Sequence, residues 1–153
     1  MSLIIKNCCF GRGVFADKAF KKGECILTFT GPIISQEQVD NKTEKEQANA
    51  LQIEDDFYRD LEEPGVFVNH SCNPNAGIQE DKILIARRDI EKGEEIFWDY
   101  ATSIDGGWTM PCACTEKECR KKVKDFRLLP KKIKETYLKE KIVLNYIVKK
   151  YSP

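Results

Sequence analysis

Cys112, Cys114 and Cys119 lie within eight residues of one another, a spacing that favours a shared metal ion. Thiolates this close repel one another and oxidise easily unless a cation compensates their charge. Zn²⁺ does so with four ligands in a tetrahedron and Zn–S bonds of about 2.3 Å. The pattern therefore predicts a zinc site and supplies three of its ligands. A redox-active Cys-x-Cys pair, or a set of unrelated free thiols, is the alternative.

The fourth ligand has five candidates elsewhere in the chain, namely Cys8, Cys9, Cys25, His70 and Cys72. The first three cysteines lie among apolar or strand-forming residues, where a free thiol usually behaves as a small buried hydrophobe. Cys72 lies on a turn-rich loop and is better placed to reach an ion. The chain has seven cysteines in all, and an odd number argues against a disulfide framework.

The loop that carries Cys72 also holds the chain's single histidine, His70. Its Asn-Pro step and the neighbouring Asn, Ser and Gly residues favour a compact polar loop over a helix. Such a loop exposes amide and carbonyl groups that can serve a ligand. The alternative is a buried strand over residues 66–68 that ends in a plain Asn-Pro turn.

Gly11 and Gly13 mark a second place where the backbone can approach a ligand without interference from a Cβ atom. The third glycine and the following helix of a dinucleotide-binding fingerprint are missing. A loop that cradles a small cofactor and a simple hairpin turn explain these two residues equally well.

The elements that must position these residues are short stretches of strand formers separated by Gly, Pro and Asn, which predict a mainly β domain. The expected strands cover residues 4–7, 25–30, 33–34, 50–53, 57–58, 66–68, 82–86 and 96–100. The polar stretch 35–49 is expected to be a solvated helix or a long insertion. In the tail, Leu129, Ile133 and Tyr137 recur at intervals of four, which predicts an amphipathic helix or helix pair packed on the β core.

Length and charge limit the class of protein. A chain of 153 residues fits one domain, and its 25 basic and 25 acidic residues cancel, which argues against binding nucleic acid through bulk charge and predicts no sequence-specific binding. Residues 120–150 are nevertheless strongly basic and residues 44–63 mainly acidic. No secretory signal and no apolar run of about 18 residues is visible. We therefore expect an intracellular protein of cytoplasm or nucleus, without membrane contact.

Four segments, taken in order, resemble the successive signatures of SET-domain protein lysine methyltransferases. They are residues 11–16 with Gly-x-Gly, residues 67–75 with Asn-His-Ser-Cys-Asn-Pro, residues 93–100 ending in Asp-Tyr, and the Cys-x-Cys-x4-Cys run at 112–119. The resemblance extends from about residue 4 to residue 119. Each motif is weak alone, and the four together in the family's order are specific.

The resemblance implies a mainly β, β-clip-like fold of small antiparallel sheets. In that fold the Asn-His-Ser-Cys and Asp-Tyr segments thread past one another in a knot-like arrangement. Short helices are expected in the insert. The SET domain would cover residues 1–119, with a post-SET zinc loop at 112–119. The remaining residues, 120–153, would form a helical tail packed on the same domain.

The resemblance also implies a cofactor and a metal. S-adenosylmethionine would be the methyl donor, and the zinc ion would take Cys72 as its fourth ligand beside Cys112, Cys114 and Cys119. The residues expected to hold the cofactor are Gly11, Arg12, Gly13, Asn69, His70, Tyr100 and, as part of a lid, Trp108.

Tyr100 is the residue that the resemblance places at the methyl transfer, with Tyr58 as a second candidate for the catalytic site and the lysine channel. Trp98 would line that channel where many family members have Phe or Tyr, so the number of methyl groups added stays open. A lysine with a pKa of about 10.4 must lose its proton before it attacks, and an apolar channel beside a sulfonium favours the neutral amine. No histidine base is then required.

The expected activity is therefore protein-lysine N-methylation, with a histone or another basic protein as substrate. The acidic residues of the insert, Glu54, Asp55, Asp56, Glu62 and Glu63, would attract such a partner, or simply form a solvated face. One alternative is a catalytically silent, zinc-stapled SET module that acts as a binding protein, and another is a zinc protein that senses redox state. Retention of Asn69, His70 and Tyr100 favours the enzyme. The pattern indicates neither the substrate protein nor the oligomeric state.

Overall fold

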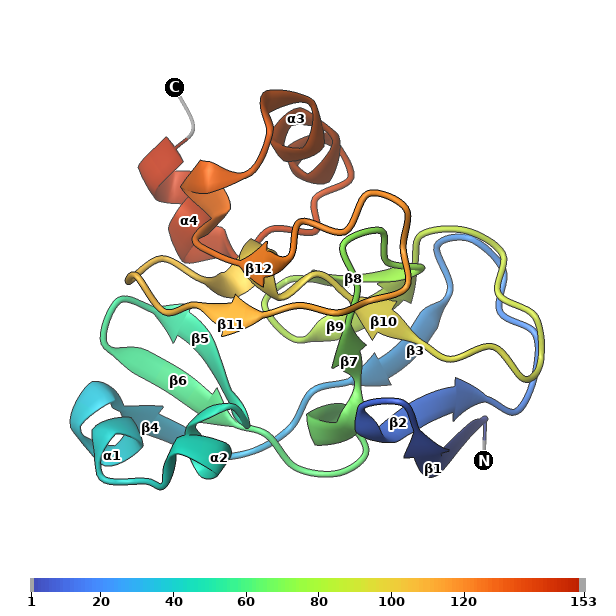
Figure 1. Cartoon of the computed structure of the whole chain (residues 1–153), viewed down its shortest axis with the longest axis horizontal. Coiled ribbons are helices and arrows are strands. Elements are labelled where there is room, and N and C mark those ends of the chain that lie inside the picture. The colour runs from blue at the N-terminus through green and yellow to red at the C-terminus, as the bar shows by residue number, and fades with distance from the viewer. Residues whose placement is uncertain (1, 152–153) are drawn as a thin grey trace.

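A computed structural model of the chain describes residues 2–151 (Figure 1). Five small sheets form its frame within this range. The first is the antiparallel hairpin of β1 (Leu3–Cys8) and β2 (Gly11–Ala16). A three-stranded sheet has the order β3 (Cys25–Thr28), β9 (Ile83–Ala86), β8 (Ala76–Gln79). Another has the order β4 (Ile33–Ser35), β6 (Phe57–Asp60), β5 (Ala50–Glu54).

The two remaining sheets are pairs of two-residue strands. In one, β7 (Asn69–His70) runs parallel to β10 (Phe97–Trp98). In the other, β11 (Met110–Pro111) is antiparallel to β12 (Lys122–Val123). The predicted mainly β fold of small, mostly antiparallel sheets is confirmed, and the parallel β7–β10 pair brings the Asn-His and Asp-Tyr segments side by side.

Two short helices, α1 (Gln36–Asp40) and α2 (Glu44–Gln47), occupy the polar insert beside the β4–β6–β5 sheet (Figure 1). Each begins with a capping box, in which the Ser35 or Thr43 side chain accepts from the backbone N–H three residues on. These local hydrogen bonds explain why a segment with few apolar anchors is helical. The insert is therefore a pair of solvated helices.

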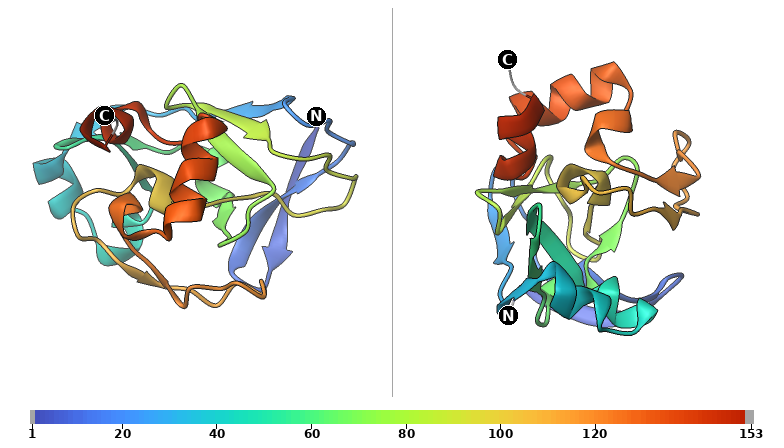
Figure 2. Two further views of the ribbon diagram at one scale, coloured as in Figure 1. Left: turned by 90° about the horizontal axis from the view of Figure 1, so that it is seen from above. Right: turned by 90° about the vertical axis from the view of Figure 1, so that its left-hand side faces the viewer.

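The tail folds into α3 (Lys131–Lys139) and α4 (Asn145–Tyr151), which lie together above the sheets (Figures 1 and 2). The apolar stretch around Ile142, between the two helices, belongs to the same buried core as β8 and β9. At Gly77 of β8, a Cβ atom would lie only 2.7 Å from Cγ2 of Ile142. The tail thus packs on the β core, and Gly77 leaves the space that this packing needs. Within residues 2–151, no helix is both long and apolar enough to cross a membrane.

Two of the expected strands are displaced. The strand expected at residues 66–68 is wrong, because Gly65–Phe67 is a 3-10 helix (η1) and pairing begins at β7. The strand expected at residues 96–100 pairs only over β10, after which Tyr100–Ser103 forms a second 3-10 helix (η2). The Asp99 side chain caps η2 by accepting from the Ala101 amide at 3.0 Å. Three or four apolar residues carry too little periodicity to separate a strand from a helical turn.

Candidate active site and cysteine cluster

The site is built around the parallel β7–β10 pair, which Asn75 holds from the adjacent turn. The buried Asn75 amide donates to the Glu95 carbonyl at 2.8 Å and accepts from the Phe97 amide at 2.9 Å. Both polar ends of this side chain are therefore used to fix the strand that leads into the Asp-Tyr motif. As a result, Tyr100 lies directly beside the end of η1.

Tyr100 is held by both its backbone and its ring. Its hydroxyl donates to the Val68 carbonyl at 2.9 Å, and its backbone amide donates to Nδ1 of His70 at 3.1 Å. The ring centroid lies 4.7 Å from that of Trp98 and 5.2 Å from that of His70. Burial, helped by the nearby Glu95 carboxylate, raises the pKa of Tyr100 well above its usual value. The hydroxyl is therefore protonated at neutral pH and can act as a hydrogen-bond donor.

His70 is neutral, and both of its ring nitrogens are in use. Burial lowers its pKa to about 4, and the neighbouring Arg120 acts in the same direction, against the opposing effect of Asp99. Because Nδ1 accepts from the Tyr100 amide, Nε2 carries the proton and donates to the Cys72 sulfur at 3.4 Å. A ring with no free lone pair cannot serve as a general base, in agreement with the expectation from the sequence.

Asn69 joins β7 to the glycine-containing strand β2. Its amide nitrogen donates to the Arg12 carbonyl at 2.8 Å and to Oε1 of Glu95 at 3.0 Å. A Cβ atom at Gly13 would lie 2.3 Å from that same Oε1, so any larger residue there would displace the Glu95 carboxylate from Asn69. Gly11 has a φ of +93°, and a Cβ atom there would meet nothing within 4 Å. The backbone at Gly11 is thus open to a ligand, at the start of a strand that follows a hairpin turn.

A cavity of about 460 Å³ adjoins the parallel pair. Tyr58, Trp98, Tyr100 and Trp108, which the sequence singled out, all line it. Tyr58 lies on β6, where its hydroxyl donates to Oε1 of Gln36 on α1 at 2.5 Å. Trp108 is 41% exposed. The residues expected in the lysine channel, Tyr58 and Trp98, therefore line one cavity together with Tyr100. Trp108, which was expected in a lid over the cofactor, lines the same cavity.

The sulfurs of Cys72, Cys112, Cys114 and Cys119 all lie within 4.8 Å of one another. Sγ of Cys112 is 3.8 Å from Sγ of Cys72 and 3.8 Å from Sγ of Cys119. A tetrahedral zinc site with Zn–S bonds of about 2.3 Å has S–S edges of about 3.8 Å. The four cysteines therefore have the geometry of a structural zinc site, and Cys8, Cys9 and Cys25 lie outside it.

Backbone amides stabilise the thiolates that such a site needs. The amides of Cys114, Arg120 and Lys121 donate to the sulfurs of Cys112, Cys72 and Cys119 respectively, each at 3.4 Å. The amide of Lys121 is the main reason why the pKa of Cys119 falls to about 7. Burial raises the pKa of Cys72 and of Cys112, so a cation is needed to hold these two sulfurs as thiolates.

Arg120 connects the cysteine cluster to the Asp-Tyr motif. Its backbone amide contacts the Cys72 sulfur at 3.4 Å, and its guanidinium donates to Oδ1 of Asp99 at 2.8 Å. The other carboxylate oxygen of Asp99 accepts from the hydroxyl of Tyr137 on α3 at 2.8 Å. The side chain of Asp99 is 1% exposed. Arg120 of the cysteine loop thus compensates the charge of Asp99, and Tyr137 of the tail donates a hydrogen bond to it.

Sequence reasoning missed Asp99, Arg120 and Tyr137 as members of one network. Asp99 precedes Tyr100 within a recognised motif, and Arg120 follows Cys119 directly. Those positions were signals that could have marked both residues. Tyr137 carried no such signal, because on an amphipathic helix it is indistinguishable from an ordinary core residue.

Comparison with known proteins identifies the family. The model of the SET domain family matches residues 11–101. A histone-lysine N-methyltransferase of Candida albicans, H3 lysine-36 specific, is 29% identical over 127 residues, or 72% of this chain and 15% of that protein. A probable histone-lysine N-methyltransferase set-23 of Caenorhabditis briggsae is 31% identical over 133 residues, or 72% of this chain and 55% of that protein.

Histone-lysine N-methyltransferase 2D of Homo sapiens is 34% identical over 128 residues, covering 72% of this chain and 2% of that protein. The chain thus spans about half of one of these relatives and far less of the other two. The family match covers more than half of the chain, and the four-cysteine cluster is consistent with a post-SET zinc site. The protein therefore belongs to the SET-domain family and is related to histone-lysine methyltransferases.

Proposed function

We propose that this protein is a protein-lysine N-methyltransferase that uses S-adenosylmethionine and acts on a histone or another basic protein. One observation carries the proposal. Val68, Trp98 and Tyr100 line one cavity, and the Tyr100 hydroxyl is hydrogen-bonded to the Val68 carbonyl. A partly aromatic cavity with a protonated tyrosine among its lining residues suits an amine that must be desolvated and aligned.

The residues that would hold the cofactor are Gly11, Arg12, Gly13, Asn69, His70, Tyr100 and Trp108. The open backbone at Gly11 is consistent with this assignment, because a ligand can approach there without meeting a Cβ atom. When bound, S-adenosylmethionine supplies a methyl group on a sulfonium. Asn69 contributes by keeping β2 against β7 through the Arg12 carbonyl.

The chain's own residues would prepare the substrate lysine. Leu51, Val68 and Trp98 line the cavity, and so do the carboxylates of Asp40 and Asp55. A lysine amine placed against the apolar residues is favoured in its neutral form, because burial disfavours the ammonium. Oxygen atoms of Tyr100 and Val68 lie together at 2.9 Å and can accept N–H groups of the neutral amine. They orient its lone pair. The proton leaves to solvent before the lysine is enclosed, and no side chain has to take it.

Zinc would be bound by Cys72, Cys112, Cys114 and Cys119 in a structural role, because all four positions are filled by the protein. The ion would fix the cysteine loop against the loop of His70. Through Arg120 it would also fix Asp99, next to Tyr100.

Transfer of labelled methyl from S-adenosylmethionine to histones and other basic proteins tests the proposal. We expect label with the wild type and at least a tenfold loss with Tyr100→Phe, while zinc content stays at one ion per chain. Tyr146→Phe is a matched control, because its buried hydroxyl donates to the Ser103 carbonyl at 2.6 Å outside the proposed catalytic group. It should cost stability and leave transfer intact. Zinc-loaded wild type that neither binds the cofactor nor transfers label would instead identify a silent binding module.

A further inference from the structure

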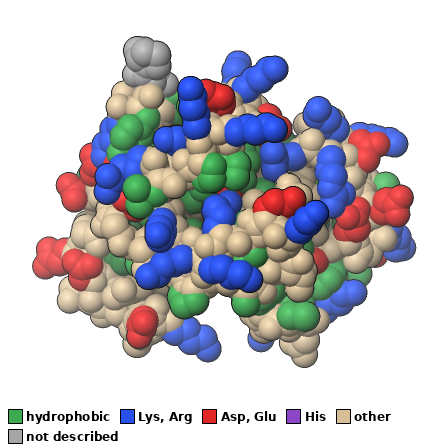
Figure 3. Space-filling view, turned by 45° about the horizontal axis from the view of Figure 1, so that its top comes forward, with side chains coloured by type: hydrophobic (Ala, Val, Ile, Leu, Met, Phe, Trp, Pro, Cys, Tyr) green, Lys and Arg blue, Asp and Glu red, His purple; other side chains and the backbone are tan. Residues whose placement is uncertain are grey.

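Charge is strongly segregated in this neutral chain. Residues 117–150 hold 13 of the 25 Lys and Arg residues and only four of the 25 Asp and Glu residues. This segment, which we call the basic segment, comprises the end of the cysteine loop, β12, α3 and α4. In the space-filling view, Lys and Arg side chains spread across the face that carries these elements, and carboxylates gather mainly toward its edges (Figure 3). The net charge of the chain, which is zero, therefore gives no indication of this basic surface.

Of the four carboxylates in the basic segment, two are engaged by groups other than its lysines. Asp125 is buried and accepts from the backbone amides of Gly106 and Gly107. Glu140 binds Arg87, at 2.7 Å from Oε2 to Nε. Glu135 pairs with Lys131 at 3.9 Å, and Glu118 forms no ion pair within residues 2–151. Only Glu118 and Glu135 are therefore left to offset the lysines of the segment.

Many lysines of the segment form no ion pair, although Lys134 donates to the Arg127 carbonyl at 3.1 Å. Nine of them form no ion pair with the part of the chain that the structure describes. They are Lys117, Lys121, Lys122, Lys124, Lys132, Lys134, Lys139, Lys141 and Lys149. Lysines that form no ion pair add to a positive potential that attracts a polyanion.

The chemistry of this surface favours phosphates of a nucleic acid over a lipid surface. A helix that lies on a membrane carries a row of large apolar residues beside its lysines. Here the large apolar side chains that are exposed on these elements are two, Leu128 on the 3-10 helix Phe126–Leu128 and Tyr151 at the end of α4. They form no row, and the Tyr151 hydroxyl donates to Asp105. Lysine is a flexible point charge that suits contacts to a phosphate backbone without reading bases.

We infer that the basic segment binds the backbone of duplex DNA without sequence preference. The choice of DNA among polyanions rests on the proposed function. Histones are among the proposed substrates, and duplex DNA is wrapped around histones. DNA held on this surface would keep the enzyme close to a substrate that lies on the same DNA. The binding itself requires neither the cofactor nor a functional active site.

The test uses the zinc-loaded full chain and a fluorescein-labelled DNA duplex of about 20 base pairs. Fluorescence anisotropy gives Kd between about 50 and 200 mM salt. Each lysine that contacts a phosphate contributes about −0.9 to the slope of log K against log salt concentration. Five contacts would give a slope of about −4.5 and weaken binding about 500-fold across that range.

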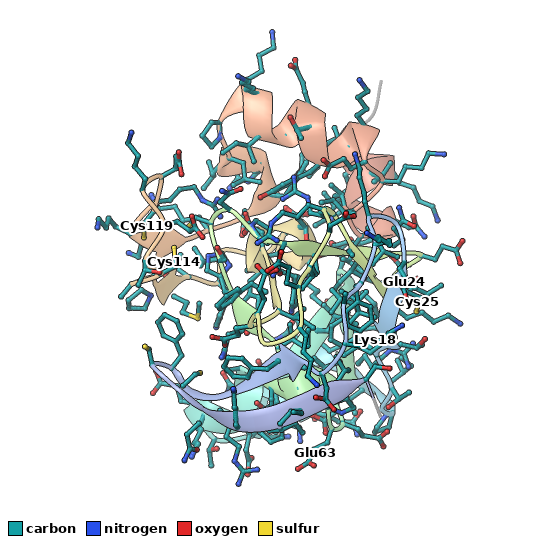
Figure 4. The ribbon with its side chains drawn as sticks, turned by 90° about the vertical axis from the view of Figure 1, so that its right-hand side faces the viewer. Lys18, Glu24, Cys25, Glu63, Cys114 and Cys119 are labelled. Carbon is teal, nitrogen blue, oxygen red and sulfur yellow. The ribbon has the colours of Figure 1, made fainter. Side chains whose placement is uncertain are left out.

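The variant Lys124→Gln/Lys132→Gln/Lys139→Gln removes three unpaired lysines and should make the slope shallower by up to about 2.7. A matched control is Lys18→Gln/Lys21→Gln/Lys22→Gln, with the same change of charge. Lys18 lies on the side of the molecule away from Cys114 and Cys119 (Figure 4). This control should leave the slope unchanged.

Three results would overturn the inference. They are no binding at about 50 mM salt, an equal effect of the two triple variants, and binding to polyglutamate or to phosphatidylserine vesicles as tight as to DNA. Methyl transfer to a free peptide, measured separately, should be unaffected by either triple variant. A chain that binds DNA and transfers no methyl group would disprove the proposed function alone.

Discussion

Replacing Arg120 by methionine should destabilise the fold by about 3 kcal/mol, because it leaves a buried carboxylate without its cation. The guanidinium lies 2.8 Å from Oδ1 of Asp99, whose side chain is 1% exposed. The apolar stem of methionine replaces most of the lost volume, so the charge is the main change. The Arg120 backbone amide, which donates to the Cys72 sulfur, is unaffected.

The magnitude follows from what remains around Asp99. Removing one partner of a buried ion pair typically costs about 3 to 5 kcal/mol. The lower end applies here, since the Ala101 amide and the Tyr137 hydroxyl still donate to the carboxylate, at 3.0 and 2.8 Å. For a domain of this size the cost corresponds to a Tm lower by about 6 to 12 °C.

Thermal unfolding of the zinc-loaded protein, followed by circular dichroism, is the assay. Arg88→Met is the matched control, because Arg88 pairs with Glu94 at 3.0 Å while its side chain is 56% exposed. An exposed pair of this kind should contribute less than about 1 kcal/mol. The double variant Asp99→Asn/Arg120→Met removes both charges and should be more stable than the sum of the single effects implies.

If Arg120→Met costs no more than Arg88→Met, the buried Asp99 carboxylate does not depend on the guanidinium. The same conclusion follows if the effects of Asp99→Asn and Arg120→Met simply add, because a buried charge pair must show coupling.

Three further predictions concern metal, packing and pH. Removing zinc with a chelator, or replacing Cys119 by serine, should lower Tm, since metal binding contributes to folding. Mass spectrometry should show that the zinc content falls below one ion per chain. An unchanged Tm after metal loss would contradict this prediction. Gly77→Ala should cost about 1 to 3 kcal/mol, because the new Cβ would lie 2.7 Å from Cγ2 and 2.9 Å from Cδ1 of Ile142. Ile142→Ala removes both of these atoms, so the double variant should be more stable in denaturant unfolding than the sum of the two single effects implies. Burial alone would raise the pKa of Asp105, but hydrogen bonds from Lys150 and Tyr151 outweigh it and lower that pKa. The stability that this carboxylate contributes is therefore fully present above its unfolded pKa of about 3.9, and it is lost as the pH falls below that value. The stability difference between wild type and Lys150→Met should therefore shrink below about pH 4, and a difference that grows in acid would show that another group is responsible.

The cysteine site was accessible from the sequence because its signal is local. Three of its members lie within eight residues, and a thiol on a turn-rich loop was the best-placed fourth. The structure brings Cys72 to that cluster and leaves Cys8, Cys9 and Cys25 apart. Residue type and spacing were sufficient for the three clustered cysteines, because few arrangements of close thiolates are chemically stable.

The strand expected at residues 66–68 shows where local pattern is insufficient. Val66, Phe67 and Val68 are strand formers, and a run of three carries no period. In the structure Gly65 packs so tightly on Phe29 that a Cβ atom would lie 2.6 Å from its ring. This tertiary contact accommodates the 3-10 turn, and pairing starts only at β7, where β10 offers a partner. The intrinsic strand propensity of these residues is small, and tertiary contacts of this kind outweigh it.

The sequence alone determined the mainly β class and the three clustered cysteines, because turn chemistry, strand propensity and ligand type act over a few neighbours. Cys72 is 40 residues from Cys112, and its place as fourth ligand came from the family resemblance. Only the tertiary structure decided that Asp99 is compensated by Arg120 and by Tyr137, which follows it by 38 residues. It also decided that Tyr58, Trp98, Tyr100 and Trp108 share one cavity. These relations depend on how the tail and the insert pack on the common core, and packing energy belongs to many distant residues at once.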